Sequence, residues 1–230
     1  MFNPKYIITP KLLENIKVIT RLITLLNNKS FPNVILTKFE KKAQVLSTYA
    51  STSIEGNPLP LTQVKTLLKS KPKYIRDSQQ EILNYNQALQ YLYNKSNQDK
   101  ISIDTVLKTQ MILTKKLLKD HQSGKFRKEP VVVYDTQNRT IQYMSPNWQE
   151  VPQMVEDLLT YLNFNINKLD PLILAGIFHR QFVIIHPFID GNGRTTRLIT
   201  TQILKLLGIN IFKLFSFENY YNNNVSKYIK

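Results

Sequence analysis

The sequence of 230 residues contains no cysteine. Without a thiol the chain cannot form a disulfide, a thiolate zinc site or an iron–sulfur cluster, and it has no cysteine nucleophile. A chain of this length buries roughly 70 % of the surface that its unfolded form exposes, so a hydrophobic core can hold it together without such a staple. Apolar residues make up 42 % of the sequence, which excludes a disordered chain.

Long hydrophobic runs are also missing. The longest ones, such as residues 182–185, fall far short of the ~20 residues that a membrane span requires. The N-terminal stretch does not combine a basic segment with an apolar one, as a secretory signal does. We therefore expect a soluble, cytoplasmic protein with no membrane partner.

Acidic residues are scarce, because 16 Asp and Glu stand against 31 Lys and Arg, and the net charge is +15. A strongly basic chain can be a nucleic-acid-binding protein. An AT-rich coding sequence, however, also produces an abundance of Lys, Asn and Ile, and we favour this explanation. Nucleic acid is therefore not expected as the main partner.

Most of the chain shows helical periodicity. Apolar residues recur every three or four positions from Leu12 to Leu26, which predicts a first helix. Similar patterns, with Gly and Pro near several of their ends, predict helices over residues 34–55, 61–69, 74–94, 102–119, 152–163, 171–185 and 194–207. Two β-rich runs, 131–134 and 140–144, flank a polar turn and predict a hairpin. The expected fold class is mainly α, a helical bundle with one β-hairpin.

The most informative stretch is 186–197, which reads His-Pro-Phe-Ile-Asp-Gly-Asn-Gly-Arg-Thr-Thr-Arg. Pro187 disfavours helical dihedral angles at His186, so one helix should end there, and the next should begin just after Gly193. Free N–H groups and the positive end of the dipole make such a helix N-terminus an anion site. Gly191 and Gly193 let the backbone approach an anion and adopt positive φ.

Charged and titratable residues surround this loop. Arg194 and Arg197 share one face of the first helical turn, where two cations oppose the dipole unless they bind a multiply charged anion such as a polyphosphate. Asp190 could hold Mg²⁺, which takes one or two carboxylates, and His186 could accept a proton from a hydroxyl. Taken singly, a G-N-G turn is only a turn and Asp190 could be a helix cap. Together these residues fit attack on a nucleotide phosphate.

Residues 186–197 resemble the signature of Fic-domain proteins, H-x-F-x-[D/E]-G-N-G-R-x-x-R, and agree with it at every specified position. The resemblance covers about residues 33–225. Within it, Gly124–Arg127 and the hairpin look like the arginine and the flap that precede the signature, and residues 178–182 look like the helix that leads into it. The resemblance implies a Fic-type helical bundle whose hairpin is the flap.

The activity that this resemblance implies is protein AMPylation. ATP would be the substrate, and a Ser, Thr or Tyr hydroxyl of a target protein would attack its α-phosphate. By position, His186 would be the base, Asp190 would hold Mg²⁺ between the α- and β-phosphates, Arg194 would contact the β-phosphate region and Arg197 the γ-phosphate. Such a transfer needs little else, because it depends mainly on positioning and charge stabilisation.

Two further assignments follow from the same resemblance. The amides of Gly191 and Gly193, together with the Asn192 side chain, would form the nest that binds the phosphates. An edge strand of the hairpin at 131–144 would pair with an extended segment of the target protein. A purely structural cover is the alternative role for this hairpin.

Glu55 stands at the end of a predicted helix, where its charge should cost about 0.3–1 kcal/mol unless a cation offsets it. The stretch Ser51–Gly56, Ser-Thr-Ser-Ile-Glu-Gly, resembles the inhibitory motif of the family, [S/T]-x-x-x-E-[G/N]. The resemblance implies that Glu55 pairs with Arg197, so that ATP binds unproductively; an exposed glutamate at a fraying helix end is the alternative. Residues 1–60 would then form a helical region that carries the inhibitory helix, and residues 61–230 the catalytic domain.

Two further basic residues, His179 and Arg127, lie outside the signature. His179, two helical turns before His186, is expected to pack or to form hydrogen bonds, not to catalyse. Arg127 is expected to orient the flap or reach the site in a supporting role.

Other hypotheses stay open. A Fic-type enzyme could use another nucleotide or remove AMP from a target, and a Fic scaffold could also serve a non-catalytic regulator that binds nucleic acid. The sequence identifies neither the target protein nor the modified hydroxyl, and it leaves homo-oligomerisation open.

Overall fold

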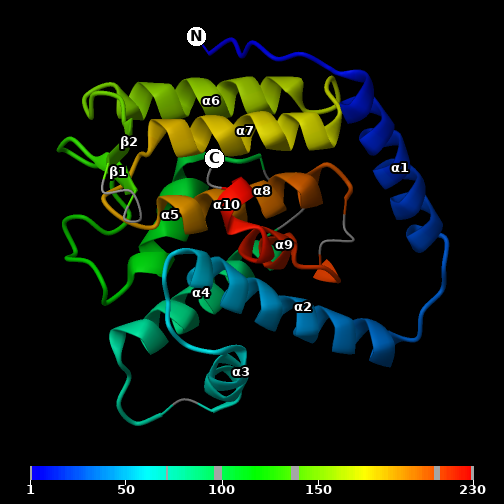
Figure 1. Cartoon of the computed structure of the whole chain (residues 1–230), viewed down its shortest axis with the longest axis horizontal. Coiled ribbons are helices and arrows are strands. Elements are labelled where there is room, and N and C mark those ends of the chain that lie inside the picture. Colours follow the sequence, from blue (N-terminus) through cyan, green and yellow to red (C-terminus); the bar gives the residue numbers. More distant parts are fainter. Residues whose placement is uncertain (1, 71, 96–99, 136–139, 210–212, 229–230) are drawn as a thin grey trace.

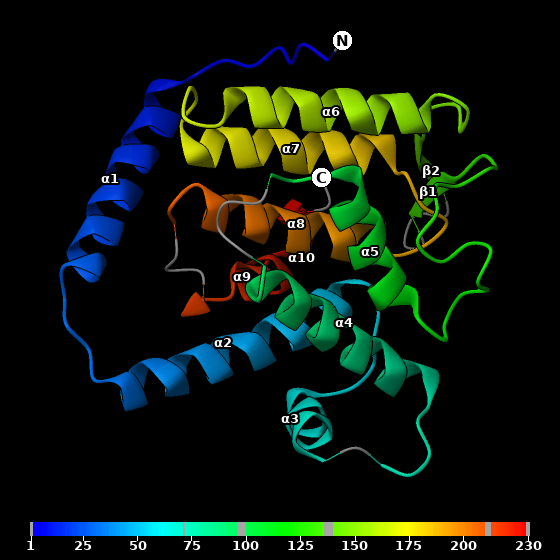
Figure 2. The same ribbon diagram turned by 180° about the vertical axis from the view of Figure 1, so that it is seen from behind.

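The computed structural model describes residues 2–70, 72–95, 100–135, 140–209 and 213–228. The structure is mainly helical, as predicted (Figures 1 and 2). The helices are α1 (Pro10–Asn27), α2 (Asn33–Ile54), α3 (Leu61–Lys69), α4 (Asp77–Tyr93), α5 (Ile103–Thr114), α6 (Val151–Asn165), α7 (Pro171–Ile185), α8 (Asn192–Leu206), α9 (Phe217–Asn223) and α10 (Val225–Tyr228). The strands are β1 (Val132–Asp135) and β2 (Thr140–Met144).

The core lies where α6, α7 and α8 stack on one another, with α4 and α5 packed against α8 (Figure 1). Leu158, Phe178, Phe182 and Ile199 from these helices are all buried. Removing one such side chain from water contributes about 1.5–3 kcal/mol, so this cluster fixes how α7 and α8 lie relative to each other. The loop between these two helices carries the signature residues.

Helix α2 has two unlike halves. Its first half is largely exposed, including the apolar side chains of Val34, Ile35 and Phe39. Its second half packs on α4 and α9 and buries small residues such as Ala50 and Ser51. Small side chains allow the backbone of α2 to approach those of α4 and α9 closely. The C-terminal end of α2 therefore lies close to α8 (Figure 2).

The prediction of a helix over 102–119 is wrong at its end, because α5 stops at Thr114. The side chain of Asn84, on α4, donates from Nδ2 to the carbonyl oxygens of Leu113 and Lys115, at 3.0 and 2.7 Å. Lys116 then takes the left-handed conformation, with φ of 64°. A distant amide therefore occupies the last carbonyls of α5, and the apolar residues beyond it belong to a turn.

The predicted hairpin is confirmed. Strands β1 and β2 are antiparallel, with Val132 opposite Met144, and the register shifts between Val133 and Tyr134. Residues 136–139 of the predicted turn lie outside the described residues. In both views the hairpin stands at the end of the bundle where α7 runs into the loop (Figures 1 and 2).

In the described part of the chain, no helix combines the length and the apolar character needed to cross a membrane. Helix α1 stands at the side of the bundle, and of its predicted apolar stripe only Ile16 is buried (Figure 1). The division of the chain into 1–60 and 61–230 stays a prediction.

Candidate active site

The loop between α7 and α8 begins where the sequence predicts. Helix α7 ends at Ile185, and His186 takes the left-handed conformation with φ of 50°. Phe188 then turns inward, is fully buried and stacks on Phe126 with ring centroids 5.8 Å apart. The aromatic contact fixes the middle of the loop, and this leaves the polar residues that follow at the N-terminus of α8.

Two side chains hold the loop backbone in place. Asn192 accepts from the backbone N–H of Phe188 at 2.9 Å and donates to its carbonyl oxygen at 2.8 Å. Arg127 donates from Nε to the carbonyl oxygen of His186 at 2.8 Å, and its own backbone N–H donates to the carbonyl of Pro187 at 2.9 Å. The Asn192 amide was expected to line the phosphate nest; in the structure both of its polar atoms serve the shape of the loop. Arg127, which was expected to orient the flap or reach the site, contacts the loop through the backbone carbonyls of His186 and Pro187, and its role stays a prediction.

The two glycines of the loop differ. Gly191 is the N-cap of α8 and has φ of 83°, as predicted, and its amide donates to Oδ1 of Asp190 at 2.6 Å. The expectation of a positive φ is wrong for Gly193, which lies within the first turn of α8. A Cβ at Gly193 would overlap Oε1 of Glu55, so in this arrangement the glycine leaves room for the Glu55 carboxylate. The helix therefore begins earlier than predicted, and the N–H groups of its first turn lack intrahelical acceptors.

His186 presents one basic nitrogen. Its Nδ1 lies 3.3 Å from the carbonyl oxygen of Val183, which can only accept, so Nδ1 carries the proton and Nε2 is left as the base. Burial lowers the pKa of His186, while the hydrogen bond to Val183 and the charges of Glu55 and Asp190 partly offset that effect. The imidazole is therefore neutral at neutral pH and able to take up a proton.

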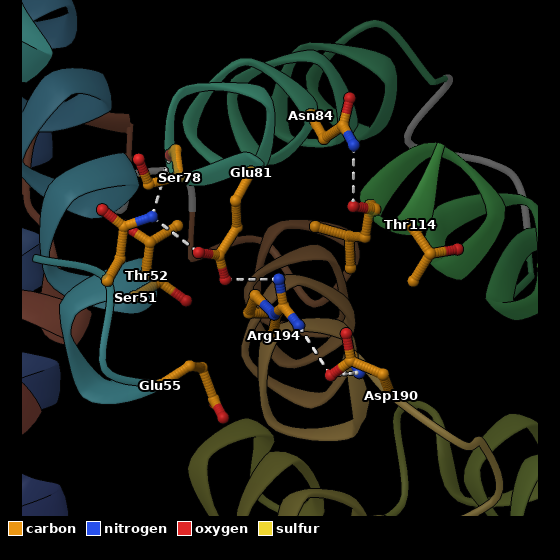
Figure 3. A network of polar contacts seen from close by, with 12 residues as sticks. Ser51, Thr52, Glu55, Ser78, Glu81, Asn84, Thr114, Asp190 and Arg194 are labelled. Carbon is orange, nitrogen blue, oxygen red and sulfur yellow. Dashed lines mark hydrogen bonds and ion pairs between the residues drawn. The ribbon is translucent and has the colours of Figure 1, made fainter. Parts of the chain in front are cut away.

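Arg194 lies between two carboxylates (Figure 3). Nη2 lies 2.8 Å from Oδ1 of Asp190, and Nη1 pairs with Oε1 of Glu81, on α4. The Arg194 side chain is only 5 % exposed. Sequence reasoning missed Glu81, because nothing near residue 81 marks it and it lies 113 residues before its partner.

Arg197 is buried against the end of α2. Its Nε donates to Oγ of Ser51 at 2.7 Å and its Nη2 donates to the carbonyl oxygen of Ser51 at 2.8 Å. Nη2 also forms an ion pair with Oε1 of Glu55 at 2.7 Å. Burial opposes the charge of Arg197, but Glu55 and neighbouring tyrosines raise its pKa, so it stays charged. Gly56 follows with φ of 91° and lets the chain turn away.

The described residues include no group of three His, Asp or Glu side chains that could hold a metal ion. Mg²⁺ does not need such a group, since one or two carboxylates suffice when phosphate oxygens and water complete its shell. Asp190 offers a carboxylate that is 48 % exposed, and the hydrogen bonds that it accepts within the described chain all go to Oδ1. Its residue type and exposure fit a Mg²⁺ ion that arrives with a nucleotide.

His179 forms hydrogen bonds and packs, as expected. Its Nδ1 lies 3.0 Å from Oγ1 of Thr200, and its Nε2 lies 3.0 Å from the hydroxyl of Tyr228. Burial, aided by the charge of Arg197, lowers the pKa of His179 to about 4. A ring that is neutral and bonded on both sides is not available as a base.

Residues 100–204 match the model of the Fic/DOC family. The chain is 32 % identical over 185 residues to protein adenylyltransferase Fic of Drosophila grimshawi, a match that covers 76 % of this chain and 36 % of the relative. It is 30 % identical over 184 residues to protein adenylyltransferase fic-1 of Caenorhabditis elegans, covering 75 % and 34 % of the two chains. This chain thus spans about a third of the length of these relatives.

Solved structures show the same architecture. The structure is similar to that of a Fic family protein from Desulfovibrio desulfuricans G20, with a TM-score of 0.81 and 25 % identity, over 99 % of this chain and 67 % of that one. It is also similar to Fic-1 from C. elegans, with a TM-score of 0.71 and 22 % identity, over 96 % and 73 % of the two chains. At 22 % identity, the second likeness is one of fold alone.

Proposed function

Because this chain belongs to the Fic/DOC family, we propose that it is a protein adenylyltransferase, which moves AMP from ATP to a Ser, Thr or Tyr hydroxyl of a target protein. We further propose that Glu55 restrains this activity. The relatives named protein adenylyltransferase Fic support the reaction class. The restraint is supported by a single contact, the buried ion pair between Glu55 and Arg197.

The proposed reaction begins at the neutral imidazole. Nε2 of His186 takes the proton of the target hydroxyl, the hydroxyl oxygen bonds to the α-phosphorus of ATP, and the bond from that phosphorus to the leaving pyrophosphate breaks. The products are an AMP ester of the target, pyrophosphate and protonated His186. His186 caps the end of α7 in the left-handed conformation and lies in the loop that leads to the start of α8, which suits this role.

Groups at the start of α8 would stabilise the negative charges of the phosphates. The N–H groups of Asn192, Gly193 and Arg194 open this helix, and such groups stabilise anions where charge develops. Arg194 would contact the β-phosphate region and Arg197 the γ-phosphate. Asp190 would hold Mg²⁺, which supplies further compensation of the phosphate charges when bound.

Glu55 occupies the place that a γ-phosphate would need. Arg197 is 1 % exposed and already donates to Ser51 and Glu55, so it has to lose its contact with Glu55 before it can pair with a phosphate. The carboxylate also lies against Gly193, beside the first turn of α8. In this state ATP would bind with its terminal phosphate displaced, and the α-phosphate would not be in line with the attacking hydroxyl.

The hairpin is proposed to bind the target. Its two strands stand beside the loop, and β2 or β1 could add an extended target segment by main-chain hydrogen bonds. In this binding mode the register of the paired backbones positions the target hydroxyl, so binding depends little on the side chains of the target.

The proposal is tested by incubating the protein with ATP that carries its label on the α- or the γ-phosphate. We expect Glu55→Gly to raise protein-bound α-label at least tenfold over the wild type, and Glu55→Gly combined with His186→Ala to abolish it. Glu150→Gly, the same substitution at the exposed N-cap of α6, serves as the matched control and should change nothing.

Each alternative has its own outcome. Transfer of γ-label would indicate a phosphotransferase, and release of AMP from a modified protein without net labelling would indicate removal of AMP. Unchanged labelling of Glu55→Gly at saturating Mg-ATP would contradict the restraint by Glu55. Absence of label from every variant, combined with salt-dependent binding of DNA, would favour the nucleic-acid-binding regulator.

A further inference from the structure

We propose that Glu81 is a positioning residue that holds Arg194 and keeps the Asp190 carboxylate available for Mg²⁺; this rests on the proposed function. The feature that carries the inference is the ion triad Glu81–Arg194–Asp190, in which one guanidinium faces two carboxylates from two different elements (Figure 3).

The two carboxylates of the triad lie in different surroundings. The Glu81 side chain is 16 % exposed and comes from α4, whereas Asp190 is 48 % exposed and lies in the loop. A ligand can therefore reach Asp190, while Glu81 stays behind Arg194. When Asp190 turns to a metal ion, Glu81 remains as the partner that keeps the guanidinium in place.

Glu81 is itself held firmly. Its Oε2 accepts from Nδ2 of Asn57 at 2.6 Å, so both of its oxygens have defined partners. Asn57 in turn donates from Nδ2 to the carbonyl oxygen of Ser78 at 2.9 Å and from its backbone N–H to that of Thr52 at 3.1 Å. The residue that orients Glu81 thus stands two positions after Glu55, in the turn that closes α2.

Charge explains why a second carboxylate is useful. With Glu81 the triad carries a net charge of −1, because two carboxylates face one guanidinium. Without it, the nearly buried cation would pair with Asp190 alone, and the net charge would be zero. A neutral pair attracts a divalent cation far less than a site with net negative charge.

The Arg194 guanidinium also depends on the Glu81 carboxylate for its orientation. Nε of Arg194 is buried and has no hydrogen-bond partner among the described residues, so Nη1 and Nη2 alone anchor the group. If Glu81 is lost, only Asp190 anchors it, and Arg194 then competes with the metal ion for the same carboxylate.

The test measures metal binding directly, in the Glu55→Gly background so that Glu55 does not interfere. Free Mn²⁺, used in place of Mg²⁺, is followed by electron paramagnetic resonance in the presence of α,β-methylene-ATP. We expect Glu81→Gln, which keeps the shape and removes the charge, to weaken Mn²⁺ binding about tenfold. Asn57→Ala keeps every charge and loosens Glu81, and should weaken binding about threefold. Glu156→Gln, an exposed position on α6, is the matched control and should have no effect.

Unchanged Mn²⁺ affinity in a folded Glu81→Gln variant would overturn the proposal, since a purely structural role would lower thermal stability without moving metal affinity. If Glu81→Gln does not fold, the Mn²⁺ affinity of Asn57→Ala is the test, and an unchanged affinity of this variant would overturn the proposal. The metal-binding readout is independent of AMP transfer, so a failure of the proposed function would appear as absent labelling alone.

Discussion

The loop at 186–191 and the segment at 51–57 meet at Arg197 and Gly193, but they are built differently. The loop is held in one conformation by the buried ring of Phe188 and by the hydrogen bonds that Asn192 and Arg127 form with its backbone. The segment ends a helix, and its Glu55 side chain is 32 % exposed. Among the described residues, none outside the adjoining chain has an atom within 4 Å of the position that a Cβ would take at Gly56.

This difference agrees with the roles that we propose. Groups that act on a reacting atom must keep one geometry, and hydrogen bonds to the backbone of the loop maintain that geometry. A restraint must be removable, and the Glu55 carboxylate is held by one arginine at the end of a helix, where local opening costs least. Substitutions in the loop, at the contact between the two regions and at the charge of Glu55 should therefore have effects of decreasing size.

The largest effect is expected from Asn192→Ala, which removes both bonds to the backbone of Phe188. Two buried backbone groups would lose their partners, at a cost of about 2–3 kcal/mol, and the melting temperature should fall by about 5 °C. Because the loop aims His186, AMP transfer in the Glu55→Gly background should fall about a hundredfold, measured with α-labelled ATP. Asn147→Ala, at an exposed position, is the control. A loss of stability with full activity would show that the loop does not depend on Asn192 for its catalytic geometry.

A smaller effect is expected from Gly193→Ala, which acts on the contact between the two regions. A methyl group there would overlap Oε1 of Glu55 and approach Nη1 of Arg197 to 3.0 Å. The flexible carboxylate should yield, so we expect a rise in α-label transfer of about tenfold over the wild type, and no further rise when Glu55 is already Gly. Gly176→Ala, within α7, is the control, because in the part of the chain that the structure describes no neighbouring side chain lies within 4 Å of the added Cβ. Reduced transfer in both backgrounds would mean that the methyl group obstructs the nucleotide instead.

The smallest effect concerns the pKa of His186. Burial is the main cause that lowers it, and the negative charge of Glu55 raises it in part. Glu55→Gln should therefore lower the pKa of His186 further, which NMR titration of the imidazole can measure. A base must be neutral to act, so transfer should rise with pH through a value below the usual 6.5 and be level at neutral pH in both proteins. An unchanged pKa would mean that the charge of Glu55 does not affect His186. A raised pKa would contradict the expected direction of the change.

Local patterns predicted most of the fold. The helices over 61–69 and 171–185 agree with the structure to the residue, because prolines and apolar periodicity mark their ends. The helix over 102–119 was predicted too long, since its end is set by the side chain of Asn84 from another helix. Gly193 shows the same limit within the site: its residue type was noticed, but its contact with the Glu55 carboxylate depends on how α2 packs beside α8.

By itself, the sequence determined the helix–loop–helix at 186–197 and the types of group that it presents, because proline and glycine restrict the backbone locally. Only the tertiary structure decided which of these groups is free and which is held. Ser51 and Glu55 lie 146 and 142 residues from Arg197, and Glu81 lies 113 residues from Arg194, yet each is within hydrogen-bond distance of its partner. The resemblance of residues 51–56 to a family motif implied the pairing of Glu55 with Arg197, whereas nothing in the sequence pointed to Glu81. Such contacts depend on how α2, α4 and α8 pack, and helix packing is a property of whole buried faces, which no short stretch of sequence contains.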